Sequence, residues 1–205
     1  MVAYPDAAIM VFCKAPIPGQ VKTRLTPYLS TEQAVQLHKK LTEQTLQTVT
    51  SKRLCDVQLW CSPTIEHRFF STLANTYNLS LYAQQGDDLG ERMHFAFSQA
   101  LTRYQTAVVV GCDCPSLANE DFEQTLCWLR QGTSCVLAPA EDGGYVLIGL
   151  NQPQLGLFTD MPWGTDKVLS LTRNRLKALD IEYKELPYQW DIDTPADLKR
   201  YRNGR

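Results

Sequence analysis

Three cationic side chains follow the first apolar run of this 205-residue chain within one short loop. The run Ala7–Cys13 leads into KAPIPGQVKTRL, in which Lys14, Lys22 and Arg24 accompany Gly19. Backbone amides of a glycine-bearing loop, with lysine and arginine beside them, suit a diphosphate or triphosphate. The spacing is not that of a P-loop, where the lysine directly follows a glycine. A solvated basic loop is the alternative, and the position directly after a strand favours phosphate binding. The side chains of Lys22 and Arg24 are expected to be exposed.

Carboxylates follow later apolar runs. Asp113 comes just after the run 107–111, and Asp191 and Asp193 stand shortly before Pro195. A carboxylate at the end of a buried strand can hold Mg²⁺, which takes one or two carboxylates plus substrate phosphate oxygens. The alternatives are a turn acid at Asp113 and a helix N-cap at Asp193.

Two further polar segments could contact a substrate. In AEDGGY, Asp142 could accept hydrogen bonds from sugar hydroxyls, although an Asp-Gly hairpin turn is the interpretation that the spacing favours. In PWGTD, Trp163 is either an exposed or a stacking aromatic. A third segment, QQGDDLGERM, reads as a polar loop that enters a helix, and His94 on that helix is expected to be structural.

Alternating strands and helices must position these segments. Apolar runs predict strands over 7–13, 57–61, 79–83, 107–111, 135–138 and 145–150. Helical spacing predicts helices over 30–49, 66–77, 91–104, 119–130 and 165–179, and a short one after Pro195. This order predicts a single α/β domain over 1–205, with a mostly parallel sheet and helices on both faces. Right-handed crossovers would then bring the carboxyl ends of every strand to one edge, where ligands bind.

Composition excludes several classes of function. There are 20 Lys and Arg residues against 22 Asp and Glu, with no basic stripe, so nucleic acid is not an expected partner. Seven cysteines without a CxxC pair are typical of reduced core thiols, although Cys112 and Cys114 leave a metal or redox role open. The first apolar run is too short for a membrane span or signal peptide, and a cytoplasmic location is expected.

Six ordered motifs together resemble the rSAM/selenodomain-associated transferases, a glycosyltransferase-like family. They are KAPIPGQVKTRL, QQGDDLGERM, GCDCPSL, APAEDGGYVLIGL, PWGTDKVL and DIDTPADL. The chain is also similar, more distantly, to 2-phospholactate and molybdenum-cofactor guanylyltransferases. The resemblance covers nearly the whole chain and implies the nucleotide-diphospho-sugar transferase (GT-A-like) fold.

The resemblance also implies roles for individual residues. The nucleotide and its phosphates would contact residues of the first two motifs: Lys14, Gly19, Lys22, Arg24, Gly90, Glu91 and Arg92. The transferred group or acceptor would lie near Asp142, Gly143, Gly144, Tyr145 and Trp163. Asp113 and Asp193 would be the ligands of Mg²⁺ or Mn²⁺. Only one acid stands at Asp113, which departs from the glycosyltransferase DxD pattern and fits a site built from two strands.

The expected function is therefore metal-dependent transfer of a glycosyl group from a nucleoside diphosphate sugar to a small-molecule acceptor. Lys22 would stabilise charge on the leaving diphosphate, and Asp142 is the candidate base. One alternative is a nucleotidyltransferase, in which a nucleoside triphosphate reacts with a phosphorylated acceptor and pyrophosphate leaves. Another is a catalytically silent nucleotide-binding protein.

Overall fold

A seven-stranded sheet forms the centre of the computed structural model, which describes residues 2–204. The strands are β1 (Ala7–Lys14), β2 (Asp56–Ser62), β3 (Ser80–Ala83), β4 (Thr106–Gly111), β5 (Cys135–Pro139), β6 (Tyr145–Leu150) and β7 (Tyr183–Glu185). Their spatial order is β3-β2-β1-β4-β6-β5-β7, and only β6 runs against its neighbours. The predicted α/β class and mostly parallel sheet are confirmed.

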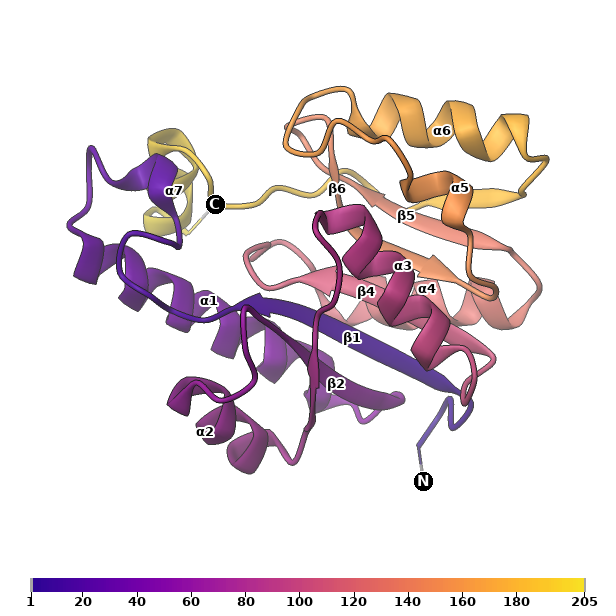
Figure 1. Ribbon diagram of the computed structural model, residues 1–205, viewed down its shortest axis with the longest axis horizontal. Helices are drawn as coiled ribbons and strands as arrows, with labels where there is room; N and C mark the ends of the chain where they lie inside the picture. Colours follow the sequence, from indigo (N-terminus) through magenta and orange to yellow (C-terminus); the bar gives the residue numbers. More distant parts are fainter. Residues whose placement is uncertain (1, 205) are drawn as a thin grey trace.

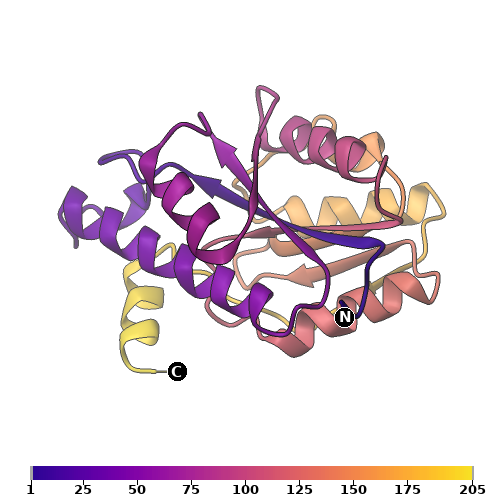
Figure 2. The ribbon, with the colours of Figure 1, turned by 90° about the horizontal axis from the view of Figure 1, so that it is seen from below.

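The helices pack on both faces of this sheet (Figures 1 and 2). They are α1 (Thr31–Ser51), α2 (Arg68–Tyr77), α3 (Leu89–Ala100), α4 (Asn119–Arg130), α5 (Leu155–Phe158), α6 (Val168–Ala178) and α7 (Pro195–Arg202), with a 3-10 turn, η1 (Thr23–Leu25). Figure 2 shows α1 and α4 below the sheet and α3, α5 and α6 above it. No helix within residues 2–204 is long and apolar enough to span a membrane.

Two apolar layers hold the helices to the sheet because alternate strand residues point to opposite faces. Along β1, Ile9 and Val11 belong to the core beneath α1 and α4, whereas Met10 and Phe12 belong to the core beneath α3. All four are buried. A strand that is buried on both faces reads as a continuous apolar run, as this one does.

One prediction about the sheet edge is wrong. The carboxyl ends of all strands do not meet at one edge, because β6 is antiparallel to both β4 and β5. The cause is the tight connection after β5, in which Gly143 N–H donates to Ala140 O and Ala140 N–H to Gly144 O. The Asp-Gly hairpin turn expected there is present, and it brings Asp142 to the same edge as the end of β4.

Capping residues fix most helix starts. The predicted capping box of α1 is present, with Gln33 N–H donating to Ser30 Oγ at 3.2 Å and Ser30 N–H to Gln33 Oε1 at 2.9 Å. Helix α3 begins at Leu89 rather than 91, because the Asp88 carboxylate accepts from Glu91 N–H at 2.8 Å. The three-residue strand β7 and the one-turn helix α5 are too short to show a period in the sequence.

Helix α7 attaches to the rest of the chain through a small separate core. Leu25 and Leu29 after the basic loop, Leu41 of α1, and Ile192 and Leu198 near the carboxyl terminus form this cluster. Figure 1 shows α7 beside the start of α1, far from β5 and β6. Because Leu25 and Ile192 are fully buried together, the basic loop and the last acidic motif are held side by side.

A candidate nucleotide and metal site at the sheet edge

Three carboxylates converge where β4 ends. Asp113 follows β4, and Asp191 and Asp193 come from the segment before α7; their carboxylate oxygens lie within 4.8 Å of one another. Backbone pairing sets this arrangement, since Ile192 N–H donates to Asp113 O at 3.2 Å. Asp191 and Asp193 point the same way because they alternate about the buried Ile192. We call these three residues the carboxylate cluster.

Lys22 lies against this cluster. Its Nζ is 2.9 Å from Asp113 Oδ2 and 3.2 Å from Asp193 Oδ1, and it donates to Ile192 O at 2.7 Å. The side chain is only 4 % exposed, so the expectation of an exposed lysine is wrong. The backbone explains the difference: Lys22 has a φ of 50°, and this left-handed turn before η1 directs the side chain inward.

Arg24 occupies the outer side of the same loop. Its guanidinium lies 3.1 Å from Asp193 Oδ2, and its side chain is 62 % exposed. Asp193 therefore contacts both cations of the loop. Its expected role as an N-cap is not found, since Thr194 caps α7 by accepting from Asp197 N–H.

The charges in this cluster shift one another's proton affinities. Burial would lower the pKa of Lys22, but the Asp113 and Asp193 carboxylates raise it above its usual value. Burial would likewise raise the pKa of Asp113, and the Lys22 ammonium outweighs that effect and lowers it. Asp191 has no such partner: burial, then the neighbouring Asp113 and Asp193 carboxylates, raise its pKa from 3.8 to about 7. The cluster thus carries more negative charge than Lys22 neutralises.

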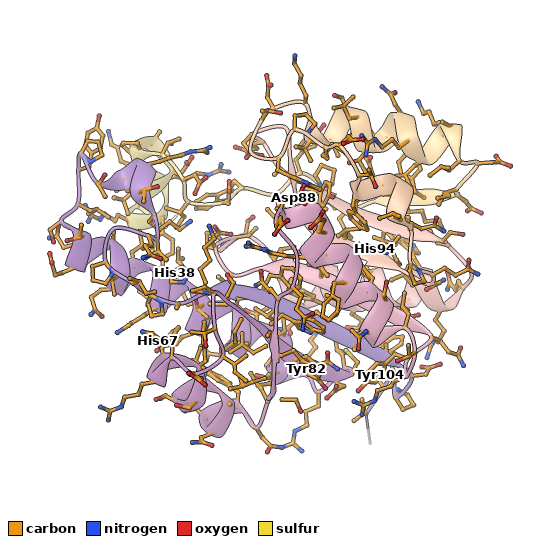
Figure 3. The ribbon with its side chains drawn as sticks, viewed as in Figure 1. His38, His67, Tyr82, Asp88, His94 and Tyr104 are labelled. Carbon is orange, nitrogen blue, oxygen red and sulfur yellow. The ribbon has the colours of Figure 1, made fainter. Side chains whose placement is uncertain are left out.

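A cavity of about 580 Å³, here called the basic cavity, opens beside the cluster. Its polar lining comes from the first two motifs and the cluster: Lys14, Gln20, Lys22, Thr23, Arg24, Gln84, Asp87, Asp88, Arg92, Asp113 and Asp193. Figure 3 labels two residues of this lining, His38 on α1 and Asp88 at the start of α3. Lys14 and Arg92 also line a smaller adjoining cavity with Ser62 and Pro63.

A second cavity of about 240 Å³, here called the apolar cavity, lies on the other side of Asp113. Its walls are mainly apolar side chains: Phe12, Leu89, Met93, Val109, Tyr145, Leu147, Ile148, Trp163 and Val168. Asp113, Asp142 and Asp191 are its acidic lining residues. Gly111 and Asp113 line both cavities, so the two spaces meet at the cluster.

Several residues predicted to contact ligand lie outside these linings. Gly90 packs against Phe158 O and the Trp163 ring, since an added Cβ would lie 2.6 Å from that oxygen. The Glu91 carboxylate accepts from Asp87 N–H at 2.8 Å and thereby fixes the start of α3. Gly19 has a φ of 77° in open surroundings and shapes the basic loop.

Gly143 is likewise absent from the lining. It has a φ of 89°, and an added Cβ would overlap the backbone of Asp166. Its carbonyl accepts from Leu169 N–H at 2.8 Å, which joins the β5–β6 turn to the start of α6. Asp142 is held by the same turn, because its Oδ1 accepts from Gly144 N–H at 2.9 Å. Gly143 therefore serves packing, whereas Asp142, Gly144 and Tyr145 line the apolar cavity.

The cysteine motif does not form one site. Cys112 lies beside Cys13 and His38, with potential ligand atoms within 4.8 Å, whereas Cys114 Sγ lies 3.4 Å from Ser116 Oγ elsewhere. His38 Nε2 is 2.8 Å from Lys14 O and so donates to it. The Cys13 thiol, against the opposing effect of burial, lowers the pKa of Cys112. The seven cysteines are all free thiols, as expected.

The sequence analysis did not include Asp191 among the expected metal ligands. The signal was available as the alternation Asp191-Ile192-Asp193, in which both acids share a face if the middle residue is buried. Oxygen atoms of three carboxylates, together with substrate phosphate, are the donor set that Mg²⁺ and Mn²⁺ prefer. The excess negative charge at Asp191 fits such a cation.

The strand order, the hairpin around β6 and the placement of the polar segments define a nucleotide-diphospho-sugar transferase fold. The chain belongs to the family described as "Uncharacterized protein conserved in bacteria (DUF2064)", which it matches over residues 45–165. A protein from Desulfovibrio desulfuricans G20, described as a candidate nucleotide-diphospho-sugar transferase, is 30 % identical. That alignment covers 98 % of this chain and 88 % of the other, with a TM-score of 0.88.

More distant structures share the fold alone. The 4-diphosphocytidyl-2C-methyl-D-erythritol synthase from Anaerococcus prevotii is 12 % identical with a TM-score of 0.64, covering 98 % of this chain and 97 % of the other. Glucosyl-3-phosphoglycerate synthase from Mycobacterium tuberculosis, a complex with Mn²⁺ and UDP, is 10 % identical with a TM-score of 0.58 and covers 96 % and 75 %. No curated protein matches the chain.

Proposed function

We propose that this protein is a metal-dependent transferase that takes a glycosyl group from a nucleoside diphosphate sugar. The observation that carries the proposal is the position of the carboxylate cluster between the basic cavity and the apolar cavity. A diphosphate in the basic cavity would place the bond to be broken at the cluster, with the apolar cavity beyond it. The description of the Desulfovibrio relative agrees with this donor class.

Asp113, Asp191 and Asp193 are the residues that would hold Mg²⁺ or Mn²⁺. The bound cation would supply charge stabilisation for the departing diphosphate. Lys22 is already held beside the cluster, with its charge fixed by Asp113 and Asp193. Once a cation neutralises these carboxylates, the Lys22 ammonium is free to bind phosphate oxygen, and Arg24 can do so from the exposed side.

Asp142 is the candidate base. The Gly144 N–H holds its carboxylate at the rim of the apolar cavity. From there it could take the proton of an acceptor hydroxyl as that oxygen attacks the anomeric carbon. The carbon–oxygen bond to the diphosphate breaks, and its electron pair leaves with the nucleoside diphosphate.

Nucleotidyl transfer remains a second candidate because of Lys22. A buried lysine beside one strand-end aspartate could bind the α-phosphate of a nucleoside triphosphate, and several fold neighbours are nucleotidyltransferases. The acceptor of a nucleotidyltransferase would be phosphorylated, however, and the charged residues that line the apolar cavity are all acids, which repel a phosphate. This charge pattern favours glycosyl transfer.

Product analysis separates the two reactions. The protein with Mn²⁺ is incubated with a panel of nucleoside diphosphate sugars, and separately with nucleoside triphosphates and sugar phosphates. We expect a nucleoside diphosphate from the first panel, by transfer or slow hydrolysis, and its loss in Asp113→Asn. Glu123→Gln on α4, outside both cavities, serves as the matched control. Acceptor-dependent pyrophosphate from the second panel alone would overturn the proposal.

A further inference from the structure

The two cavities that meet at Asp113 differ in charge and polarity. The basic cavity is lined by four cationic side chains, Lys14, Lys22, Arg24 and Arg92, and by four carboxylates, Asp87, Asp88, Asp113 and Asp193. The apolar cavity, among the described residues that line it, contains no lysine, arginine, histidine, asparagine or glutamine. Its charged groups are the carboxylates of Asp113, Asp142 and Asp191. Two such different surfaces select two different kinds of molecule.

The apolar walls come from three separate elements, which makes the cavity a built feature of the fold. Met93 of α3, Val109 of β4 and Ile148 of β6 are all buried in the same core on one face of the sheet, and all three line the space. Trp163 adds an aromatic surface and makes an edge contact with Tyr145, their ring centroids 6.4 Å apart. These side chains offer mainly contact area. The Tyr145 hydroxyl and Trp163 Nε1 have no hydrogen-bond partner among the described residues, and both atoms are buried beneath the surface.

That lining excludes strongly polar occupants. A sugar or polyol buried here would leave several hydroxyls without partners, which is unfavourable because their bonds to water are lost. A phosphate or carboxylate would face Asp142 and Asp191 at short range without a compensating cation from the wall. An uncharged hydrocarbon body has no hydroxyls that lose their bonds to water and no charge that the carboxylates repel. A single hydroxyl on it can donate to a carboxylate at the rim.

The volume limits the size of this body. An apolar cavity of about 150 Å³ holds benzene. A cavity of about 240 Å³ therefore accommodates one ring with a short chain, or a small fused ring system. Larger bodies would need to extend past the exposed Leu89 at the mouth.

We propose that the apolar cavity binds the acceptor, and that this acceptor is an uncharged alcohol with an apolar body of one or two rings. Its hydroxyl would lie at the rim, beside Asp142 and the carboxylate cluster. In the transfer step, which rests on the proposed function, the alcohol oxygen forms the new bond to the anomeric carbon. The bond from that carbon to the diphosphate breaks, and the hydroxyl proton goes to Asp142. Binding of the alcohol does not depend on that chemistry.

Binding is measured by calorimetry on the full chain with four probes: benzyl alcohol, 2-naphthalenemethanol, benzyl phosphate and glucose. We expect both alcohols to bind, and benzyl phosphate and glucose to bind at least tenfold more weakly. Crystals soaked with 4-bromobenzyl alcohol should place the anomalous bromine signal in the apolar cavity. Equal affinity for benzyl phosphate, tight binding of glucose, or bromine found only elsewhere would overturn the inference.

Enlarged wall residues provide a second readout. Val109→Phe and Val168→Phe, from opposite walls, should each weaken alcohol binding at least tenfold, whereas the exposed Leu179→Phe should leave it unchanged. Unchanged binding in either folded wall variant contradicts the assignment, and the bromine signal decides the matter if both variants misfold. Alcohol binding without turnover of any nucleotide sugar would refute glycosyl transfer alone. Turnover of a nucleoside diphosphate sugar with a sugar phosphate as the acceptor, without alcohol binding, would refute the proposed acceptor class alone.

Discussion

Replacing Asp191 by asparagine should stabilise the metal-free protein at neutral pH and above. In the folded protein, burial and the nearby Asp113 and Asp193 carboxylates raise the pKa of Asp191 from 3.8 to about 7. The folded state therefore binds a proton that the unfolded state has lost between these two values. The contribution of Asp191 to stability must therefore fall as the pH rises from about 4 to about 7, and the Asp191→Asn variant lacks this loss.

The size of this gain in stability follows from the difference between the folded-state and unfolded-state pKa values of Asp191. About three pH units at 1.36 kcal/mol each set an upper limit of about 4 kcal/mol. Solvent reaches this half-buried carboxylate and screens its neighbours, so we expect a gain of about 1–2 kcal/mol in the free energy of unfolding at pH 8. At pH 4 the variant and the wild type should differ little, because the carboxyl is protonated in the folded state and about half protonated in the unfolded state.

Urea unfolding in the presence of a chelator, at intervals from pH 4 to pH 8, measures this difference. The exposed acid Asp160 provides a matched control, and Asp160→Asn should follow the wild type throughout. Added Mn²⁺ should stabilise the wild type at pH 8 and the Asp191→Asn variant much less. A variant that is less stable than the wild type at pH 8, or a difference that does not change with pH, would refute the argument that uncompensated carboxylates crowd this site.

Three further substitutions test the surroundings of the cluster. Lys22→Met should lower the free energy of unfolding of the metal-free protein by about 2–3 kcal/mol, because two carboxylates lose a buried partner; a stability equal to the wild type in urea unfolding would contradict this. Arg24→Ala should leave folding unchanged, since the side chain is 62 % exposed, and should weaken nucleoside diphosphate binding by about 1.5–3 kcal/mol in calorimetry; full affinity would remove Arg24 from the site. Gly143→Ala should cost about 2 kcal/mol of stability through its left-handed backbone, and an unchanged melting temperature would show that the turn adapts.

Much of the fold follows from residue patterns. Strand β1 could be located because it is a continuous apolar run, helix α4 because its apolar residues recur at helical spacing, and α1 because Ser30 and Gln33 form a visible capping box. Strand β7 could not, because its three residues are half-buried and owe their conformation to pairing with β5. The antiparallel direction of β6 could have been predicted from the sequence. The Asp-Gly turn before it is too short for the crossover that a parallel strand requires.

The candidate site, like the fold, was predictable from the sequence only in part. Motif order placed Asp113, Asp193 and the basic loop at the sheet edge, because chemistry-bearing residues follow strands in this kind of fold. Burial of Lys22 depends on contacts between segments about 170 residues apart. The charge imbalance at Asp191 depends on burial and on Asp113, which comes from a different segment, so neither feature has a local signature. Gly90 and Gly143 show a second limit of the sequence: each is predicted as a ligand contact because it stands beside polar residues, and close packing in the fold also requires a glycine there.

The central claim is that Asp113, Asp191 and Asp193 bind a divalent cation next to a nucleotide diphosphate. Anomalous scattering from a crystal grown with Mn²⁺ and a nucleoside diphosphate tests it most directly. The account predicts one strong Mn²⁺ peak bonded to oxygens of this cluster and of the diphosphate, with Lys22 and Arg24 on the phosphates. A cation held elsewhere, or a nucleotide bound with Lys22 still paired to Asp113 and no cation between the carboxylates, would contradict it.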